Sequence, residues 1–91
     1  INGYLEITII ISSNGSVKKP VISYKGIPQR DEDESFIFDI EDEILSICRS
    51  FSMENKKQQQ NLIDTIKQNC RRIVREKTGK KPFTNINITR I

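Results

Sequence analysis

The chain has 91 residues, of which 35% are hydrophobic and 30% charged, and its formal net charge is +3. A chain of this length forms one small domain that buries about 60–65% of its unfolded surface, so a deep catalytic cleft is not expected. The composition excludes a disordered tail, and no apolar run approaches the about 18 residues that a membrane-spanning helix requires. We therefore expect residues 1–91 to form one soluble domain.

The start of the chain predicts a β-hairpin. Side chains alternate over residues 4–11 with the period of two that is typical of a strand, and its strongly apolar face consists of Leu5, Ile7, Ile9 and Ile11. Asn14 and Gly15 follow, and this pair supplies the positive φ angles of a tight turn. A second strand, from about Pro20 to Ile27, should therefore return antiparallel to the first. Its sequence does not decide which face points inward.

Two amphipathic helices are predicted next. The first follows the acidic run at residues 31–34 and carries apolar side chains at three- and four-residue steps, namely Ile37, Ile40, Ile44, Ile47, Cys48 and Phe51. A polar, glutamine-rich stretch from Met53 to Gln60 forms a turn or a loosely wound start of the second helix. That helix repeats the pattern with Leu62, Ile63, Ile66, Cys70, Ile73 and Val74. It ends at Gly79, because a glycine closes the last turn and Pro82 prevents continuation.

The last predicted element is a third strand, which is marked by Phe83, Ile86 and Ile88 and finishes at Ile91. The order β-β-α-α-β with one apolar stripe on each helix predicts an α+β domain, in which two helices cover one face of a three-stranded sheet. Because the helices form an antiparallel pair, the third strand should run parallel to the first and lie beside it, in the order 2-1-3.

The other face of this sheet is a candidate interface. Its expected members on the first strand include Tyr4, Thr8 and Ile10. Such a face is either solvated or docks on another surface, and the aromatic and aliphatic side chains favour docking.

No catalytic or metal-binding motif is found in the sequence. Without a histidine, neither a histidine-activated nucleophile nor a histidine-ligated metal is available within these residues. The acidic residues 31–34 and 39–43 lack the glycine and the spacing of a calcium loop, which favours solvated runs over a cation site. Cys48 and Cys70 are predicted to be buried free thiols, because their offset of roughly 12 Å along a helix hairpin exceeds the about 7 Å that a disulfide spans. We expect no catalytic residue, metal or cofactor here.

Charge is separated along the chain. Eight of the twelve acidic residues lie between residues 31 and 43, whereas Lys67 and Arg72 belong to a basic cluster on the second helix and its exit. Such a cluster can neutralise phosphates, and the candidate RNA contacts in it are Arg71, Arg75, Lys77, Lys80 and Lys81. The alternative is an ordinary polar helix face, partly balanced by the acidic helix. No aromatic residue lies among these cations, which argues against base stacking.

The segment EKTGKKP at residues 76–82 is typical of a capped helix end, but with its surroundings it also resembles a known family. The C-terminal domain of ribonuclease J ends its two-helix segment in a motif of the type EKTGRRP, followed by a short apolar strand. Residues 2–9 (NGYLEITI) are similar to the opening of that family, and residues 20–27 (PVISYKGI) and 70–74 (CRRIV) resemble two further segments. The acidic run and the glutamine-rich loop depart from the pattern. The order of the segments carries the resemblance.

The resemblance implies that the parent is a cytoplasmic ribonuclease with a zinc-dependent metallo-β-lactamase core and a β-CASP insertion, which degrades RNA by 5′-to-3′ exonucleolytic and endonucleolytic cleavage. A start at Ile1, without an initiator methionine or a signal peptide, is what we expect of a piece of a longer protein. For residues 1–91 the resemblance implies a non-catalytic C-terminal domain that supports homo-oligomerisation and activity, with RNA and zinc bound by the parent and no membrane involved. The alternative is an accessory RNA-binding module.

Overall fold

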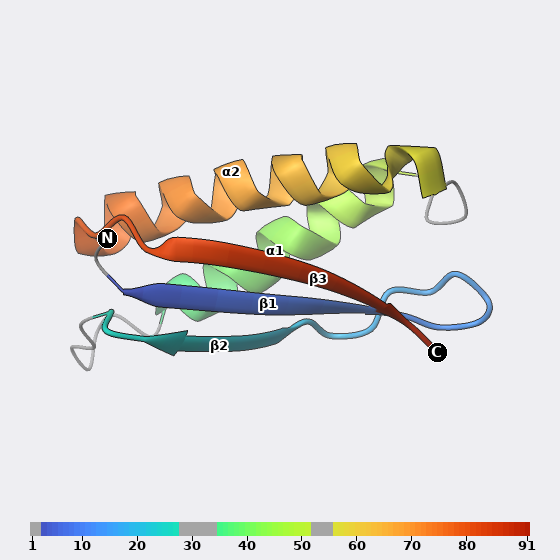
Figure 1. Ribbon diagram of the computed structural model, residues 1–91, viewed down its shortest axis with the longest axis horizontal. Helices are drawn as coiled ribbons and strands as arrows, with labels where there is room; N and C mark the ends of the chain where they lie inside the picture. Colours follow the sequence, from blue (N-terminus) through green and yellow to red (C-terminus); the bar gives the residue numbers. More distant parts are fainter. Residues whose placement is uncertain (1–2, 28–34, 52–55) are drawn as a thin grey trace.

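A computed structural model describes residues 3–27, 35–51 and 56–91, and its elements are shown in Figure 1. They are, in chain order, β1 (Tyr4–Ile11), β2 (Val21–Lys25), α1 (Ser35–Ser50), the short 3-10 helix η1 (Lys56–Gln58), α2 (Gln59–Thr78) and β3 (Phe83–Arg90). This order confirms the predicted α+β arrangement β-β-α-α-β. The acidic run at residues 31–34 and the first residues of the glutamine-rich stretch lie outside the described residues.

The three strands form one sheet in the order β2-β1-β3. The central strand β1 pairs antiparallel with β2, so that Ile7 lies opposite Ile22. It pairs in parallel with β3, where Ile7 lies beside Ile86. The order and the directions of the strands are therefore those that the sequence predicts.

The connection between β1 and β2 contains an extra residue. Val17 forms a bridge with Ile11, whereas Val21 pairs with Thr8, so four steps along the returning segment match three steps along β1. Pro20 lies in this segment and has no N–H to donate to the ladder. For this reason β2 begins at Val21 and not at Pro20. It ends at Lys25 and not at Ile27, because Gly26 adopts a left-handed conformation with a φ of 71°.

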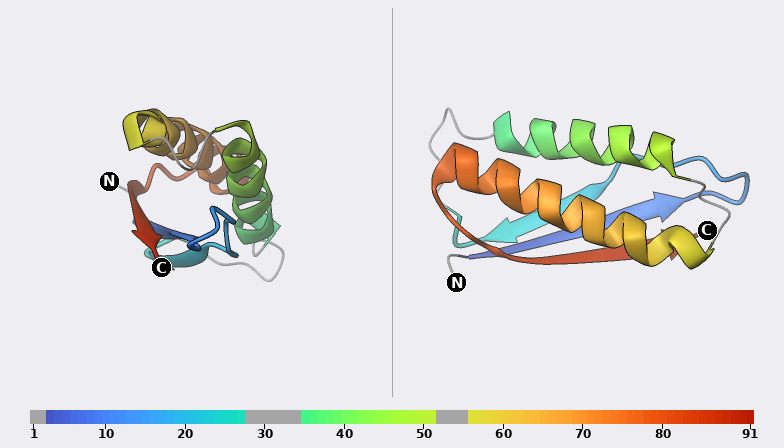
Figure 2. Two further views of the ribbon diagram at one scale, coloured as in Figure 1. Left: turned by 90° about the vertical axis from the view of Figure 1, so that its right-hand side faces the viewer. Right: turned by 90° about the horizontal axis from the view of Figure 1, so that it is seen from above.

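Both helices cover the same face of the sheet, as the two views of Figure 2 show. The buried stripe of β1 is the predicted one, Leu5, Ile7, Ile9 and Ile11. The helices bury one stripe each against it: Phe36, Ile40, Ile44, Ile47 and Cys48 from α1, and Leu62, Ile66, Cys70 and Val74 from α2. Burial of these side chains is the main contribution to the stability of a fold of this kind.

Strand β2 turns Ile22 and Tyr24 toward the helices, where both side chains pack against the core. The ring of Tyr24 meets the ring of Phe36 edge to face, with centroids 5.5 Å apart. Val21 points to the opposite side and is 55% exposed. The structure thereby decides the orientation of β2 that its sequence left open.

The end of α2 is fixed by three hydrogen bonds, one between backbone groups and two made by a side-chain hydroxyl. Gly79 adopts a left-handed conformation with a φ of 73°, and its N–H donates to the carbonyl oxygen of Arg75 at 2.9 Å. The hydroxyl of Thr78 donates to the carbonyl oxygen of Val74 at 2.7 Å and accepts a hydrogen bond from the N–H of Lys80 at 3.2 Å. The predicted capped end is therefore present, and it sets the direction in which the chain leaves the helix.

Cys48 and Cys70 are free thiols and both are buried, as predicted. Burial, followed by the charge of Glu43, raises the pKa of Cys70 to about 12. Burial also raises the pKa of Cys48. The two thiols therefore remain protonated at neutral pH and pack as small apolar side chains.

Candidate functional site

The uncovered face of the sheet carries side chains from all three strands. Strand alternation and register place eleven residues on it: Tyr4, Glu6, Thr8 and Ile10 of β1, Val21, Ser23 and Lys25 of β2, and Phe83, Asn85, Asn87 and Thr89 of β3. We call this set the open sheet face. The predicted interface residues Tyr4, Thr8 and Ile10 all belong to it, and so do two exposed apolar residues that the sequence did not single out, Val21 and Phe83.

The largest feature of the open sheet face is an aromatic pair. The rings of Tyr4 and Phe83 stack with centroids 5.9 Å apart and an angle of 11° between their planes. Parallel pairing of β1 with β3 puts the first residues of the two strands side by side, which brings these rings together. Tyr4 is 38% exposed and Phe83 is 53% exposed, so the pair presents apolar surface to the outside.

The polar groups next to this stack are bonded to one another. The hydroxyl of Tyr4 donates to Oε2 of Glu6 at 3.0 Å, and Nδ2 of Asn87 donates to Oε1 of Glu6 at 3.1 Å. The hydrogen bond to Glu6, with smaller contributions from burial and from the charge of Glu6, raises the pKa of Tyr4. Because both carboxylate oxygens have a partner, covering Glu6 costs less than covering an unpaired carboxylate.

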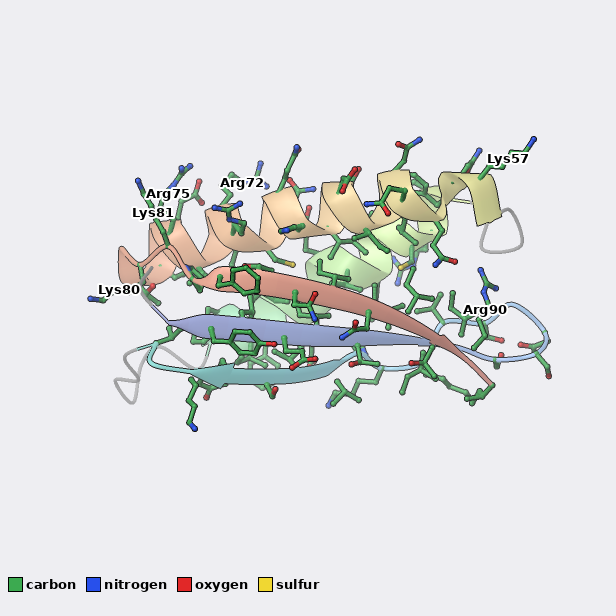
Figure 3. All side chains as sticks on the ribbon, in the orientation of Figure 1. Lys57, Arg72, Arg75, Lys80, Lys81 and Arg90 are labelled. Carbon is green, nitrogen blue, oxygen red and sulfur yellow. The ribbon has the colours of Figure 1, made fainter. Side chains whose placement is uncertain are left out.

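A second surface is formed by the basic part of α2. A shallow groove of about 330 Å³ is lined by Gln68, Arg71, Arg72, Arg75 and Lys81, and we call it the basic groove. Three of the predicted RNA contacts, Arg71, Arg75 and Lys81, are therefore brought together. Figure 3 shows Arg72, Arg75 and Lys81 gathered near the C-terminal end of α2.

The other two predicted RNA contacts lie elsewhere. Nζ of Lys77 is 3.2 Å from Oδ2 of Asp39, which belongs to α1. That ion pair borders a hollow of about 440 Å³ between the helices, which is lined by Asp39, Asp42, Glu43, Ser46, Ile73, Glu76 and Lys77. Lys80 does not line the basic groove, and in Figure 3 its side chain points away from the cluster around Lys81.

The described residues contain neither a cluster of metal ligands nor a membrane-spanning helix. Among residues 3–27, 35–51 and 56–91, no three histidine, cysteine or acidic residues are grouped so that they could hold a metal ion. None of the helices in this part of the chain has the length and hydropathy needed to span a bilayer.

The fold and the two surfaces define a class of protein: a small α+β domain of the β-β-α-α-β type with one open sheet face and one basic helix face. The chain matches the family of the ribonuclease J C-terminal domain over residues 1–91, its whole length. It therefore belongs to the ribonuclease J C-terminal domain family, as the order of its sequence segments indicated. A comparison with individual curated proteins gives no match.

Proposed function

We propose that this chain is the non-catalytic C-terminal domain of a longer, ribonuclease J-like enzyme and that its open sheet face holds neighbouring copies together. Self-association would in turn support the activity of the enzyme. The family match supports the attachment to a ribonuclease. The observation that favours assembly is a sheet face that no described element covers and that exposes Tyr4, Val21 and Phe83 next to a hydrogen-bonded Glu6.

The composition of the open sheet face suits pairing with an identical surface. Aromatic or aliphatic side chains from each of its three strands are exposed, with Tyr4 and Phe83 at one end and Val21 on the strand across β1. Its charged residues are Glu6 and Lys25, and Glu6 is already hydrogen-bonded. Pairing of identical patches about a twofold axis is the commonest way in which proteins bury such a surface.

The size of the face predicts weak association of the domain alone. Eight residues at about 3.3 Å each and three strands about 4.8 Å apart give a flat area on the order of 400 Å². A standard interface buries about 800 Å² on each partner. We therefore propose that the domain contributes part of a larger contact, to which the rest of the parent enzyme adds.

The parent enzyme that we propose has a zinc-dependent metallo-β-lactamase core with a β-CASP insertion and degrades RNA in the cytoplasm. The chemistry would be carried out by that core, with the zinc bound there. This chain has no histidine and thus lacks the metal ligand that such cores use most. Its contribution would be to the assembly and to the positioning of the catalytic domains.

Static light scattering on the 91-residue chain tests the assembly function. We expect the mean mass to rise from the monomer value toward a dimer or higher species as the concentration approaches the millimolar range. A mass that stays at the monomer value over that whole range would contradict the proposal.

The second candidate function is accessory RNA binding by α2 and its exit. The observation that favours it is that Arg71, Arg75 and Lys81 line one groove. Retention of oligonucleotides with a strong salt dependence, weakened by charge reversal at Lys81, would support this function. Unchanged retention would remove that lysine from the site.

A further inference from the structure

The two sides of α2 carry opposite charge. On one side the basic groove has four cationic side chains and one amide, and no carboxylate lines it. On the other side, four of the seven residues around the hollow between the helices are acidic, and its one lysine, Lys77, is paired with Asp39. A polyanion that approaches α2 is therefore attracted to one side and repelled from the other.

The cations of the basic groove are not neutralised by the described part of the protein. Within residues 3–27, 35–51 and 56–91, no carboxylate forms an ion pair with Arg71, Arg72, Arg75 or Lys81. Four unpaired cations around one groove repel one another, and a bound anion relieves this repulsion. By contrast, an ordinary solvated helix face would contain charges of both signs.

The geometry of α2 explains why these side chains converge. Arg71 and Arg72 lie three and four residues after Gln68, and Arg75 lies four and three residues after them, so the four side chains form a stripe along one side of the helix. Lys77 lies about 200° around the helix from Arg75 and faces α1 instead.

Lys81 reaches the groove from the segment after the helix. The left-handed turn at Gly79 and the two hydrogen bonds of Thr78 fix the start of this segment. The buried ring of Pro82 anchors its other end. Because both ends are held, Lys81 loses less conformational freedom on binding a ligand than a lysine on a loose loop would lose.

We propose that the basic groove binds the phosphodiester backbone of RNA without reading the bases. Guanidinium groups suit this role, because their planar fork donates two parallel hydrogen bonds to a phosphate. The amide of Gln68 adds a neutral donor for a phosphate or sugar oxygen. The choice of RNA as the polyanion rests on the proposed attachment to a ribonuclease. Since no aromatic ring lines the groove, the bases have no stacking platform there.

This site shares no residue with the proposed assembly surface. The basic groove is lined by side chains of α2 and of the segment after it, whereas the open sheet face consists of side chains of β1, β2 and β3. Because the two surfaces share no residue, a substitution in one of them tests it without removing a side chain from the other. The two proposals can therefore fail independently.

Fluorescence anisotropy with a labelled single-stranded oligouridylate, measured on the 91-residue chain at several salt concentrations, tests the site. Four phosphate contacts predict a slope of log K against log salt of about −3, since each contact contributes about −0.7. Arg72→Gln and Lys81→Gln should each make the slope shallower by about 0.7. Lys80→Gln is the matched control, because it removes the same charge one residue away and outside the groove, and it should leave the slope unchanged. An oligoadenylate of equal length should bind equally well.

Four results would overturn the proposal. Equal effects of Lys80→Gln and Lys81→Gln would show diffuse attraction to the whole basic end instead of a site. A marked preference for one base would show readout that this groove cannot provide. Loss of self-association in Arg72→Gln, seen by light scattering, would show that the groove receives an acidic surface of a second copy instead of RNA. Failure to bind any oligonucleotide, with self-association intact, would overturn this inference and leave the assembly function standing.

Discussion

The ring of Tyr4 stacks on the ring of Phe83, with centroids 5.9 Å apart, although the two residues lie near opposite ends of the chain. This contact joins the first residue of β1 to the first residue of β3 on the open sheet face. The same contact therefore holds two strands of the sheet together and forms part of the surface that we propose for assembly.

The stack should contribute to the stability of the monomer. Phe83→Ala is expected to lower the free energy of unfolding by about 0.5–1.5 kcal/mol, the range measured for aromatic pairs. Urea denaturation at a concentration where the chain is monomeric would measure this. Phe38→Ala is the matched control, because Phe38 is 63% exposed on α1, and its effect should stay within about 0.5 kcal/mol. Equal losses in the two variants would mean that the stack adds nothing.

The hydrogen bond from Tyr4 to Glu6 predicts a defined pH dependence. It raises the pKa of Tyr4 above its ordinary value of 10.0, so the folded chain holds a proton that the unfolded chain releases. The stability from this contact is thus complete below about pH 10 and is lost as the pH rises through the raised pKa. In a Tyr24→Phe background, ultraviolet absorbance would follow the ionisation of Tyr4 alone. Glu6→Gln should lower its pKa, and an unchanged titration curve would contradict the role of Glu6.

The raised pKa of Cys70 predicts a second loss of stability at alkaline pH. Its pKa of about 12 in the folded chain exceeds the ordinary value of 9.0, so its contribution to stability is present below about pH 9 and is lost as the pH rises toward 12. At neutral pH a thiol reagent should label neither cysteine in the native chain and both in urea. Rapid labelling of the native chain would show that the thiols are not shielded by the core.

A close backbone contact predicts that replacing Gly3 by alanine lowers the stability of the fold strongly. A Cβ atom there would lie 2.8 Å from the carbonyl oxygen of Lys25, and Gly3 has a φ of 103°. Gly15 has a φ of 84° but an open environment, so Gly15→Ala measures the backbone strain alone, about 1–2 kcal/mol. Gly3→Ala should cost at least about 1 kcal/mol more than Gly15→Ala, because a backbone clash is added to the strain. Thermal unfolding of both variants compares them, and equal melting temperatures would show that the clash is relieved by a small shift of the backbone.

Much of this fold follows from the sequence, because its strongest patterns are local. The alternation of four aliphatic residues in β1 and the apolar stripes of both helices leave one way to bury them, and the parallel placement of β3 follows from the antiparallel helix pair. The pattern around Phe36 was less informative, since Phe36, Ile37 and Phe38 are consecutive and all three are hydrophobic. The structure buries Phe36 under Tyr24 and leaves Phe38 exposed. That choice depends on β2, which is distant in the sequence.

The candidate sites were less predictable than the fold. The helical period already separates Lys77 from Arg75, and this signal could have excluded Lys77 from the groove. The positions of Lys80 and Lys81 could not be derived in the same way, because they follow Gly79 and their directions depend on the turn and on the burial of Pro82. The stacking of Tyr4 on Phe83 could not be predicted either, because it depends on the register between β1 and β3. Hydrophobic alternation alone does not give this register.

The measurement that tests the central claim most directly is sedimentation of the 91-residue chain and two charge-bearing variants over a range of concentrations. Phe83→Asp places a carboxylate on the open sheet face near Glu6, whereas Phe38→Asp places one on an exposed site of α1. If the open sheet face joins two copies, the wild-type chain and Phe38→Asp will associate alike, and Phe83→Asp will remain monomeric while still folded by circular dichroism. Undiminished association of a folded Phe83→Asp variant, or a wild-type chain that is monomeric at every concentration, would contradict the account.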